Sequence, residues 1–589
     1  DGFSDVIFGA NGYTNGQSEE GRAFLYYGTP SGLSDTSAQW QNESNQSSSY
    51  YGVSVGDAGD VNGDGFSDVI IGASYYDNGQ TDEGKVFVYH GSANGPDTTA
   101  DWTAEGGGAE TYFGSAVATA GDVNGDGYGD VIIGANNYQP TGGIITTGKV
   151  VVHFGASSGL SATADWSESG DQDDCTFGYA VGTAGDVNGD GYSDILITAA
   201  FYDNGQTDEG RAYVYHGSDS GPGSSPDWDA ESDVADWHFG LAAATAGDVN
   251  GDGFSDVIIG ANAGDSDHSD KGKVFVYHGS SSGLGSTAAW TAQGDQADSR
   301  FGAAVDTAGD VNGDGYSDVI VGAHYYDNPE NGEGMAFVYH GSASGLSASA
   351  NWSADSDLAG AAFGGSVGTA GDINGDGYSD VVVGARLFTD GQTYEGAGYV
   401  FAGSDTGLGA SPVWTWTSNH TQAYFGIDVG TAGDVNGDGY SDVIFGANRY
   451  TNDQSEEGRA YIFYGNGGGG LSLQPQQRRY DNTAPIGPGG LTDQPDAARL
   501  SATGRSPFGR GDVKLQWEVK TGSTPFNGGS LDEGASWADS GTSGAGLNDQ
   551  LVTMGDGLLR GIRGHANAEF LRLDLGRASD FHWGLLLLN

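Results

Sequence analysis

Short apolar runs alternate with turns rich in Gly and Asp along most of the chain. In one stretch, the alternating segment SAVATA (115–120) is followed by the loop GDVNGDGYGD (121–130) and the β-branched run VIIGA (131–135). A polar loop then leads to GKVVVHFG (148–155), and a second Gly-rich turn leads to a segment around Trp166. Short alternating or β-branched runs bounded by Gly, Asn or Asp predict strands. No window shows the 3.6-residue period of an amphipathic helix, so the pattern predicts an all-β fold.

This unit is repeated. The string DVNGDGFSD begins at Asp60, and close copies follow at steps of 62 residues, with one step of 64. Tryptophan recurs with the same step, from Trp40 to Trp414. Four strands per unit, repeated seven times, predict a seven-bladed β-propeller of four-stranded blades, in which neighbouring units bury faces that one unit could not bury alone.

The two ends of the repeat raise the question of how the ring closes. Residues 1–48 hold a partial unit that begins with DGFSD, and residues 49–470 hold the propeller, whose last unit lacks a Trp-bearing outer strand. We expect the segment around Trp40 to pair with the last unit, at 460–464, because this pairing would remove two exposed strand edges. The rival is a ring of eight units in which the first has no inner strand.

The repeat stops after Gly465. Residues 471–495 are rich in Gly and Pro and are typical of a linker. Residues 496–589 contain DVKLQWEVK and similar runs, which suggest a small, partial β-sandwich resembling a fibronectin type III module. The last thirty residues show no clear periodicity, and we predict no structure for them.

The repeated loop carries the candidate chemistry. In DVNGDGFSD, side-chain oxygens stand at positions 1, 3, 5 and 9, and position 7 can offer its backbone carbonyl. Three carboxylates and one amide form an oxygen-only donor set, which suits Ca²⁺ with its 6–8 oxygen ligands. An EF-hand would need a Glu at position 12 and flanking helices, but position 12 is Ile71 and a strand follows.

We therefore expect about seven Ca²⁺ sites, one in each complete loop. The predicted ligands at positions 1, 3, 5, 7 and 9 are Asp60, Asn62, Asp64, Phe66, Asp68; Asp122, Asn124, Asp126, Tyr128, Asp130; Asp186, Asn188, Asp190, Tyr192, Asp194; Asp248, Asn250, Asp252, Phe254, Asp256; Asp310, Asn312, Asp314, Tyr316, Asp318; Asp372, Asn374, Asp376, Tyr378, Asp380; and Asp434, Asn436, Asp438, Tyr440, Asp442.

The charge of the chain limits its partners. The formal net charge is −59, which argues against binding nucleic acid or anionic lipid, because both favour basic surfaces. No apolar stretch approaches the ~20 residues that span a bilayer, so we expect no direct membrane insertion. Five histidines recur at about the repeat spacing, and we expect them to hold one structural position in five units: His90, His153, His216, His278 and His340.

The motifs together resemble a known family. Phe113-Gly114, the loop 122–130 and Gly134-Ala135 are similar to the FG-GAP repeat of integrin α subunits and their bacterial relatives, and the resemblance covers roughly residues 1–465. It implies a seven-bladed propeller with calcium in the loop that joins the first two strands of a blade. One unit departs from the pattern, with Tyr51-Gly52 in place of Phe-Gly.

These observations favour an extracellular or cell-surface, calcium-binding adhesion or ligand-binding module, and not an enzyme. We expect a protein or glycan ligand on the face opposite the calcium loops, where Tyr75, Tyr76, Tyr202 and Tyr325 stand among acidic residues. The alternative is that these tyrosines pack between blades. Two other functions stay open, an accessory propeller of a secreted polysaccharide- or lipid-degrading enzyme, and a calcium-stiffened structural surface protein.

Overall fold

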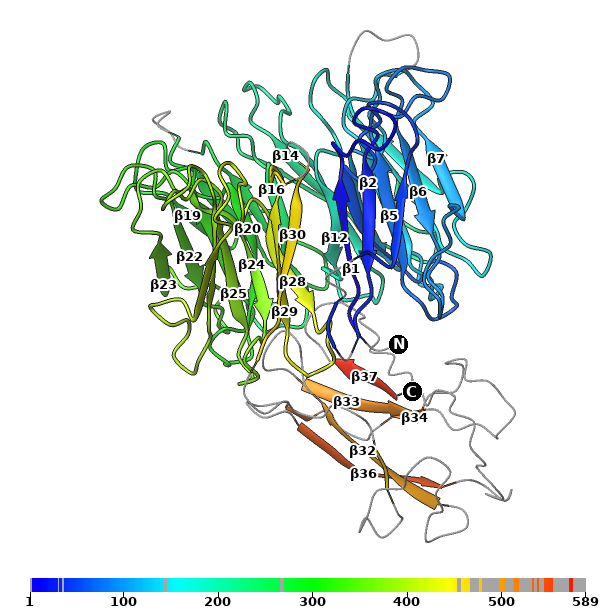
Figure 1. Ribbon diagram of the computed structural model, residues 1–589, viewed down its shortest axis with the longest axis vertical. Helices are drawn as coiled ribbons and strands as arrows, with labels where there is room; N and C mark the ends of the chain where they lie inside the picture. The colour runs from blue at the N-terminus through cyan, green and yellow to red at the C-terminus, as the bar shows by residue number, and fades with distance from the viewer. Residues whose placement is uncertain are drawn as a thin grey trace.

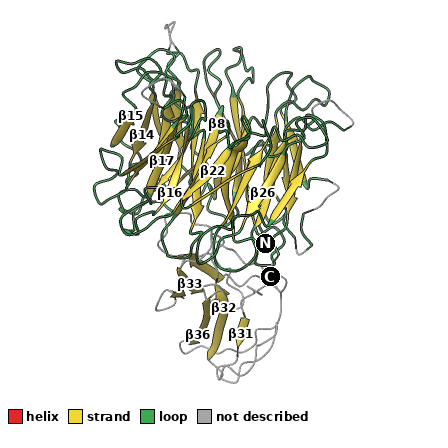
Figure 2. Cartoon of the chain, turned by 90° about the vertical axis from the view of Figure 1, so that its left-hand side faces the viewer, coloured by secondary structure: helices red, strands yellow, loops and turns green. Residues whose placement is uncertain are grey.

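The computed structural model describes residues 3–29, 31–33, 37–140, 146–264, 270–452 and 457–466, together with seven short strands between Gln476 and Leu575. All regular elements among these residues are strands (Figure 2). Antiparallel sheets follow one another along the chain and surround a common centre (Figure 1). The first strands of consecutive sheets contact each other in order, β4 with β8 and onward to β24 with β28.

The strands of the ring are the following. The first sheet has β1 (Val6–Ala10), β2 (Arg22–Tyr26) and β3 (Trp40–Glu43). The second has β4 (Ser54–Gly59), β5 (Asp68–Ala73), β6 (Lys85–Tyr89) and β7 (Trp102–Glu105). The third has β8 (Ala116–Gly121), β9 (Asp130–Ala135), β10 (Lys149–His153) and β11 (Trp166–Ser169). The fourth has β12 (Val181–Gly185), β13 (Asp194–Ala199), β14 (Arg211–Tyr215) and β15 (Trp228–Glu231).

The ring continues with the same order of strands. The fifth sheet has β16 (Ala242–Gly247), β17 (Asp256–Ala261), β18 (Lys273–Tyr277) and β19 (Trp290–Gln293). The sixth has β20 (Ala304–Gly309), β21 (Asp318–Ala323), β22 (Met335–Tyr339) and β23 (Trp352–Asp355). The seventh has β24 (Phe363–Gly371), β25 (Asp380–Ala385), β26 (Ala397–Phe401) and β27 (Trp414–Thr417). The eighth has β28 (Val429–Gly433), β29 (Asp442–Ala447) and β30 (Arg459–Phe463).

The propeller therefore has eight blades, and the prediction of seven is wrong. The first sheet lacks an inner strand and the eighth lacks an outer one, and each remains a separate three-stranded sheet. The Trp40 strand does not join the last unit, because it pairs with its own neighbour β2, Leu25 opposite Trp40. Its indole donates to the carbonyl of Asp97 in the second sheet, as Trp102 does to Ser161 in the third.

Contacts of the same type as those between the other sheets join the eighth sheet to the first. The amide of Ser4 donates to the carbonyl of Asp434 at 2.9 Å, as that of Ser441 donates to Asp372 between the seventh and eighth sheets at the same distance. The Tyr464 hydroxyl accepts from the amide of Leu33 at 2.7 Å. The ring closes through these loop contacts and not through the strand exchange that we expected.

The core lies between neighbouring sheets. The second strand of each blade from β5 to β25 is buried along its whole length. The Phe of the Phe-Gly motif is also buried and packs on the third strand of its own sheet, as Phe239 does on Phe275, with ring centroids 5.2 Å apart. A side chain on Gly72 would meet the backbone oxygen of Gly114 at 2.1 Å, so the Gly-Ala and Phe-Gly motifs mark a close approach of two sheets.

The recurring histidines are structural in four of the five units. The rings of His90, His216, His278 and His340 lie against a turn glycine of the next sheet. In the third sheet Phe154 takes this place, against Gly221. His153 therefore stands one position earlier than we expected, and its ring packs edge-on against Trp102 at 4.6 Å.

Beyond the ring, the described strands form two small sheets. One contains β31 (Gln476–Arg478), β32 (Ala497–Gly504) and β36 (Ala545–Thr553). The other contains β33 (Asp512–Trp517), β34 (Asp532–Glu533), β35 (Ala538–Asp539) and β37 (Leu571–Leu575). These strands do not show the fibronectin type III arrangement that we expected, and most of the expected linker (471–495) lies outside the described residues.

Candidate functional site: the aspartate loops

Each predicted calcium loop joins the first strand of a blade to the second. The first strand ends in a β-bulge, where the register shifts between Thr119 and Gly121 in the third sheet and at the equivalent place in the other six sheets that have an aspartate loop. A bulge bends its strand, so it turns the chain out of the sheet and into the loop. Position 9 of the loop is then the first residue of the second strand, as in Asp68 of β5.

Backbone amides point at the carboxylate of position 1. In the second sheet, Gly63 and Asp64 donate to Asp60 Oδ1 at 2.7 and 3.1 Å, and Gly65 donates to Oδ2 at 2.8 Å. Gly63 and Gly65 have φ values of 73° and 90°, a left-handed conformation that glycine adopts without strain. In all seven loops the amide nitrogen of position 5 lies 3.1 Å from the carboxylate Oδ1 of position 1, so the seven loops share one conformation.

The aspartate at position 9 is buried and holds the loop to its sheet. Asp68 Oδ2 accepts from the amide of Val61 at 2.9 Å, and Oδ1 accepts from the amide of Gly91, after the third strand, at 2.7 Å. The pKa of Asp68 is raised to about 7, chiefly by burial and to a smaller extent by the nearby Asp60 and Asp64 carboxylates, although the two amide bonds lower it. The same causes raise the pKa of Asp194 and Asp256 to about 8.

The aromatic residue at position 7 has a role that the sequence analysis missed. A side chain on Gly63 would meet the ring of Tyr128 at 2.4 Å, so the aromatic ring of one loop covers the glycine of the preceding loop. The loop of the eighth sheet follows the same rule, because the ring of Phe3 in the first sheet covers Gly437. The regular pairing of an aromatic at position 7 with a glycine at position 4, one repeat apart, could have revealed this contact.

The predicted ligands of each loop lie together at one end of a blade, but their carboxylates do not converge. Among the described residues, three acidic side chains do bring their oxygens within 4.8 Å of one another: Glu209, Glu231 and Asp233. They lie at the end of the fourth sheet opposite its aspartate loop. In the loops, Asp64 instead accepts from the amide of Phe66 at 3.0 Å. A carboxylate has about four lone-pair sites, so each loop aspartate keeps acceptor capacity toward a cation.

The tyrosines expected on the opposite face divide into two groups. Tyr75 and Tyr325 are 36% and 45% exposed. Tyr75 lies within 5.1 Å of the ring of Tyr50 and 4.7 Å of that of Tyr112, so three tyrosines form one cluster there. Tyr202 is buried and packs on Tyr213, as the alternative interpretation states, and Tyr76 packs on Phe87.

A cleft of ≈ 430 Å³ opens between the second and third sheets. Its charged groups already have partners within the protein. Glu105 pairs with Lys85 at 2.9 Å, and the ammonium of Lys149 lies 5.2 Å from the centre of the Tyr138 ring. A ligand would therefore compete with existing contacts, and this cleft is a weaker candidate site than the tyrosine cluster.

Comparison with known proteins agrees with this architecture. The FG-GAP repeat model matches residues 52–89, 113–152, 177–215, 239–277, 301–339, 363–401 and 425–463. Integrin alpha-PS2 of Drosophila melanogaster is 34% identical over 233 residues, which cover 37% of this chain and 16% of that protein. Integrin alpha-5 of Xenopus laevis is 34% identical over 251 residues, or 41% and 22% of the two chains.

Integrin alpha-V of Gallus gallus is also similar. It is 31% identical over 222 residues, which cover 36% of this chain and 20% of that protein. The chain thus matches at most 22% of the length of these relatives. All three relatives are integrin α subunits and not enzymes. The matched residues are the strands and loops described above, and the chain is an integrin α-like FG-GAP repeat propeller.

Proposed function

We propose that this chain is an extracellular, calcium-binding propeller that acts by binding a protein or glycan ligand. The observation that carries the calcium part is the common geometry of the seven loops. In every loop the amide of position 2 donates to the buried aspartate of position 9 at 2.8 or 2.9 Å. Turn formation alone does not require a buried carboxylate with two acidic neighbours in each of seven copies, whereas a hard cation does.

The residues fit calcium by their chemistry. The side chains at positions 1, 3, 5 and 9 and the carbonyl at position 7 supply oxygen donors, and water can complete a set of 6–8 ligands. Burial raises the pKa of the position 9 aspartates, and the two amide bonds to each only partly offset this, so a negative charge there is incompletely compensated by the protein. A bound divalent cation would supply this compensation and would oppose part of the net charge of −59.

The ligand part of the proposal rests on the tyrosine cluster. Exposed aromatic rings beside polar groups are common in protein and glycan sites. The cluster of Tyr50, Tyr75 and Tyr112 offers such a surface on the face opposite the aspartate loops. The similarity to integrin α subunits favours an adhesion-type ligand outside the cell. No helix among the described residues is long and apolar enough to cross a membrane.

Calcium removal tests the first part. A site that binds calcium only in the folded state stabilises it by about 2.7 kcal/mol when free calcium is a hundred times Kd. The melting temperature should fall in EGTA and return with Ca²⁺, and less completely with Mg²⁺. A melting temperature that is equal in EGTA and in Ca²⁺ would contradict the calcium sites.

Binding to glycan arrays and immobilised matrix proteins tests the second part. Tyr75→Ala should lower the signal, whereas Asn94→Ala, an exposed change in a turn on the calcium-loop side, should not. Equal binding by both variants would remove the tyrosine cluster as the ligand site.

A further inference from the structure

A second acidic cluster lies on the fourth sheet, at the end opposite its aspartate loop. We name Glu209, Glu231 and Asp233 the acidic triad. Glu209 ends the loop between β13 and β14, and Glu231 ends β15, so the antiparallel order of the strands brings them to one end of the blade. Oxygens of the three carboxylates lie within 4.8 Å of one another.

The central carboxylate of the acidic triad lacks a partner for one of its oxygens. Glu209 is 0% exposed. Its Oε1 accepts from the amide of Asn204, while Oε2 has no hydrogen-bond partner among the described residues. Glu231 Oε1 accepts from the Asn204 side chain at 2.7 Å, and its Oε2 also has no hydrogen bond there. A buried carboxylate oxygen without a partner is costly unless a proton or a cation compensates it.

Arg211 is the basic group that contacts the acidic triad among the described residues, and Asp229 competes for it. Arg211 donates through both Nε and Nη2 to Asp229, and its Nη1 lies 3.7 Å from Glu231 Oε2, beyond hydrogen-bond distance. One guanidinium is thus shared between Asp229, which it hydrogen-bonds, and Glu231, with which it forms a longer ion pair. The cluster carries more negative than positive charge.

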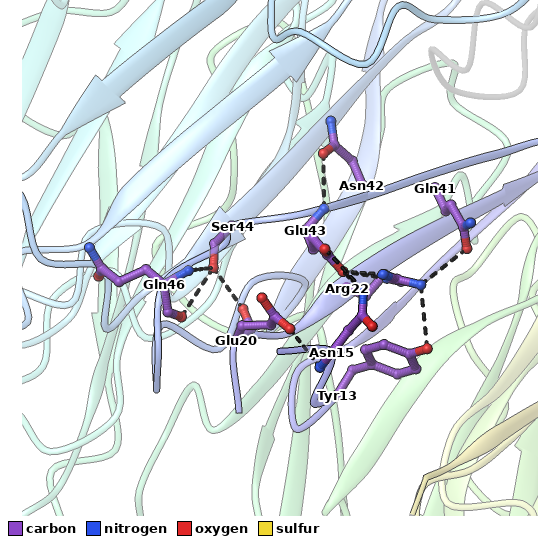
Figure 3. A network of polar contacts seen from close by, with 9 residues as sticks. All are labelled: Tyr13, Asn15, Glu20, Arg22, Gln41, Asn42, Glu43, Ser44 and Gln46. Carbon is purple, nitrogen blue, oxygen red and sulfur yellow. Dashed lines mark hydrogen bonds and ion pairs between the residues drawn. The ribbon is translucent and has the colours of Figure 1, made fainter. Parts of the chain in front are cut away.

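The first sheet shows the same positions with less negative charge (Figure 3). There Arg22 donates through Nε and Nη2 to Glu43, the equivalent of Glu231, because Gln41 stands where Asp229 would compete for it. Asn45 replaces Asp233. Glu20 is as buried as Glu209, and its Oε2 likewise has no hydrogen-bond partner among the described residues, but its neighbour Glu43 is paired with Arg22. One arginine for two glutamates leaves a formal charge of −1 (1 − 2) in the first sheet, and Asp in place of both Gln41 and Asn45 makes it −3 (1 − 4) in the fourth.

We propose that the acidic triad binds a divalent cation, calcium by preference, as a site separate from the aspartate loops. Its donors are oxygens alone, which suits a hard cation. Asp233 is exposed, so water can reach the site and complete the coordination. The sixth sheet also has acidic residues at all three positions, Glu333, Asp355 and Asp357, and both carboxylate oxygens of the buried Glu333 lack a partner among the described residues.

The test counts calcium ions bound to the full chain by native mass spectrometry and measures affinity by calcium titration. Glu209→Gln keeps the size and the Asn204 contact of the side chain but removes its charge, and it should bind one ion fewer than the parent. Glu20→Gln is the matched control in the first sheet and should bind the same number. Asp233→Asn should weaken one site about tenfold or more, because affinity depends on ligand charge.

The outcomes separate the two kinds of site. Asp190 lies in the aspartate loop of the same sheet. The double variant Asp190→Ala with Glu209→Gln should show whether the loss of an ion at the loop and the loss of an ion at the acidic triad are independent. If the aspartate loops bind no calcium, Glu209→Gln still lowers the count. If Glu209→Gln does not fold, the exposed Asp233→Asn decides by its affinity. An unchanged count and affinity in the folded variants, or an equal loss in Glu20→Gln, would overturn the proposal.

Discussion

The two roles of a loop aspartate can be separated within one loop of the fifth sheet. Asp256, at position 9, is buried, and its oxygens accept from the amides of Val249 and Gly279, both at 2.8 Å. Asp252, at position 5, is exposed and accepts one amide bond, from Phe254 at 3.1 Å. Alanine at either position removes a proposed calcium ligand, but alanine at 256 also leaves two buried amides without partners.

The difference should appear in calcium-free protein. Each buried amide that loses its partner costs about 1–3 kcal/mol, so Asp256→Ala should lower the free energy of unfolding in EGTA by about 2–6 kcal/mol. Asp252→Ala should cost less than about 1 kcal/mol, because water replaces its single bond. In saturating calcium both variants should bind one ion fewer than the parent.

The assay is urea unfolding followed by tryptophan fluorescence, in EGTA and in calcium, with ion counting by native mass spectrometry. Each variant is the control for the other, since both delete one carboxylate from the same loop. Equal destabilisation of the two variants in EGTA would refute the assignment of a structural role to position 9. A normal ion count in both would refute the assignment of a metal site to the loop.

Three further outcomes follow from the structure. Folding raises the pKa of Asp194 from 3.8 to about 8, so the folded state binds the proton more tightly than the unfolded state. The stability of calcium-free protein should therefore fall as the pH rises from about 4 to about 8. Urea midpoints in EGTA measure this, and a flat profile would contradict it. Gly72→Ala should cost about 1–3 kcal/mol, because its side chain would meet a backbone oxygen at 2.1 Å, whereas Gly56→Ala, with nearest contacts at 3.8 Å, serves as the control in thermal melts. Tyr464→Phe should cost about 0.5–1.5 kcal/mol by the same assay, because it removes the bond to Leu33 between the eighth and first sheets, and no change would show that this bond does not help to close the ring.

The repeat made the strands and loops predictable from the sequence. The β-branched run after each loop becomes the second strand, and Asp68 begins β5 because position 9 of the loop lies at the strand entry. Glycines occupy loop positions 4 and 6, where the backbone takes the left-handed conformation that glycine adopts without strain. These features depend on local sequence, and the same local sequence occurs in each unit.

Features that depend on contacts between units were not predictable in the same way. The aromatic at position 7 was considered for its carbonyl alone, yet its ring covers a glycine one repeat earlier, as Tyr128 covers Gly63. The acidic triad was missed because its residues come from a loop and a distant strand end, and because the difference from the first sheet is two side chains, Asp229 and Asp233.

The number of blades shows why the edge argument failed. Strand exchange would have removed two edges, but Trp40 would have had to leave both its register with Leu25 and its bond to Asp97 in the next sheet. The partial first unit instead keeps the parts that other units use to contact a preceding blade, including Ser4 and the ring of Phe3. Because these groups meet Asp434 and Gly437 as their equivalents meet between successive sheets from the second to the seventh, an incomplete unit suffices to close the ring. Ring size in this protein therefore follows from which units can make the repeated loop contacts, and not from how many units have all four strands.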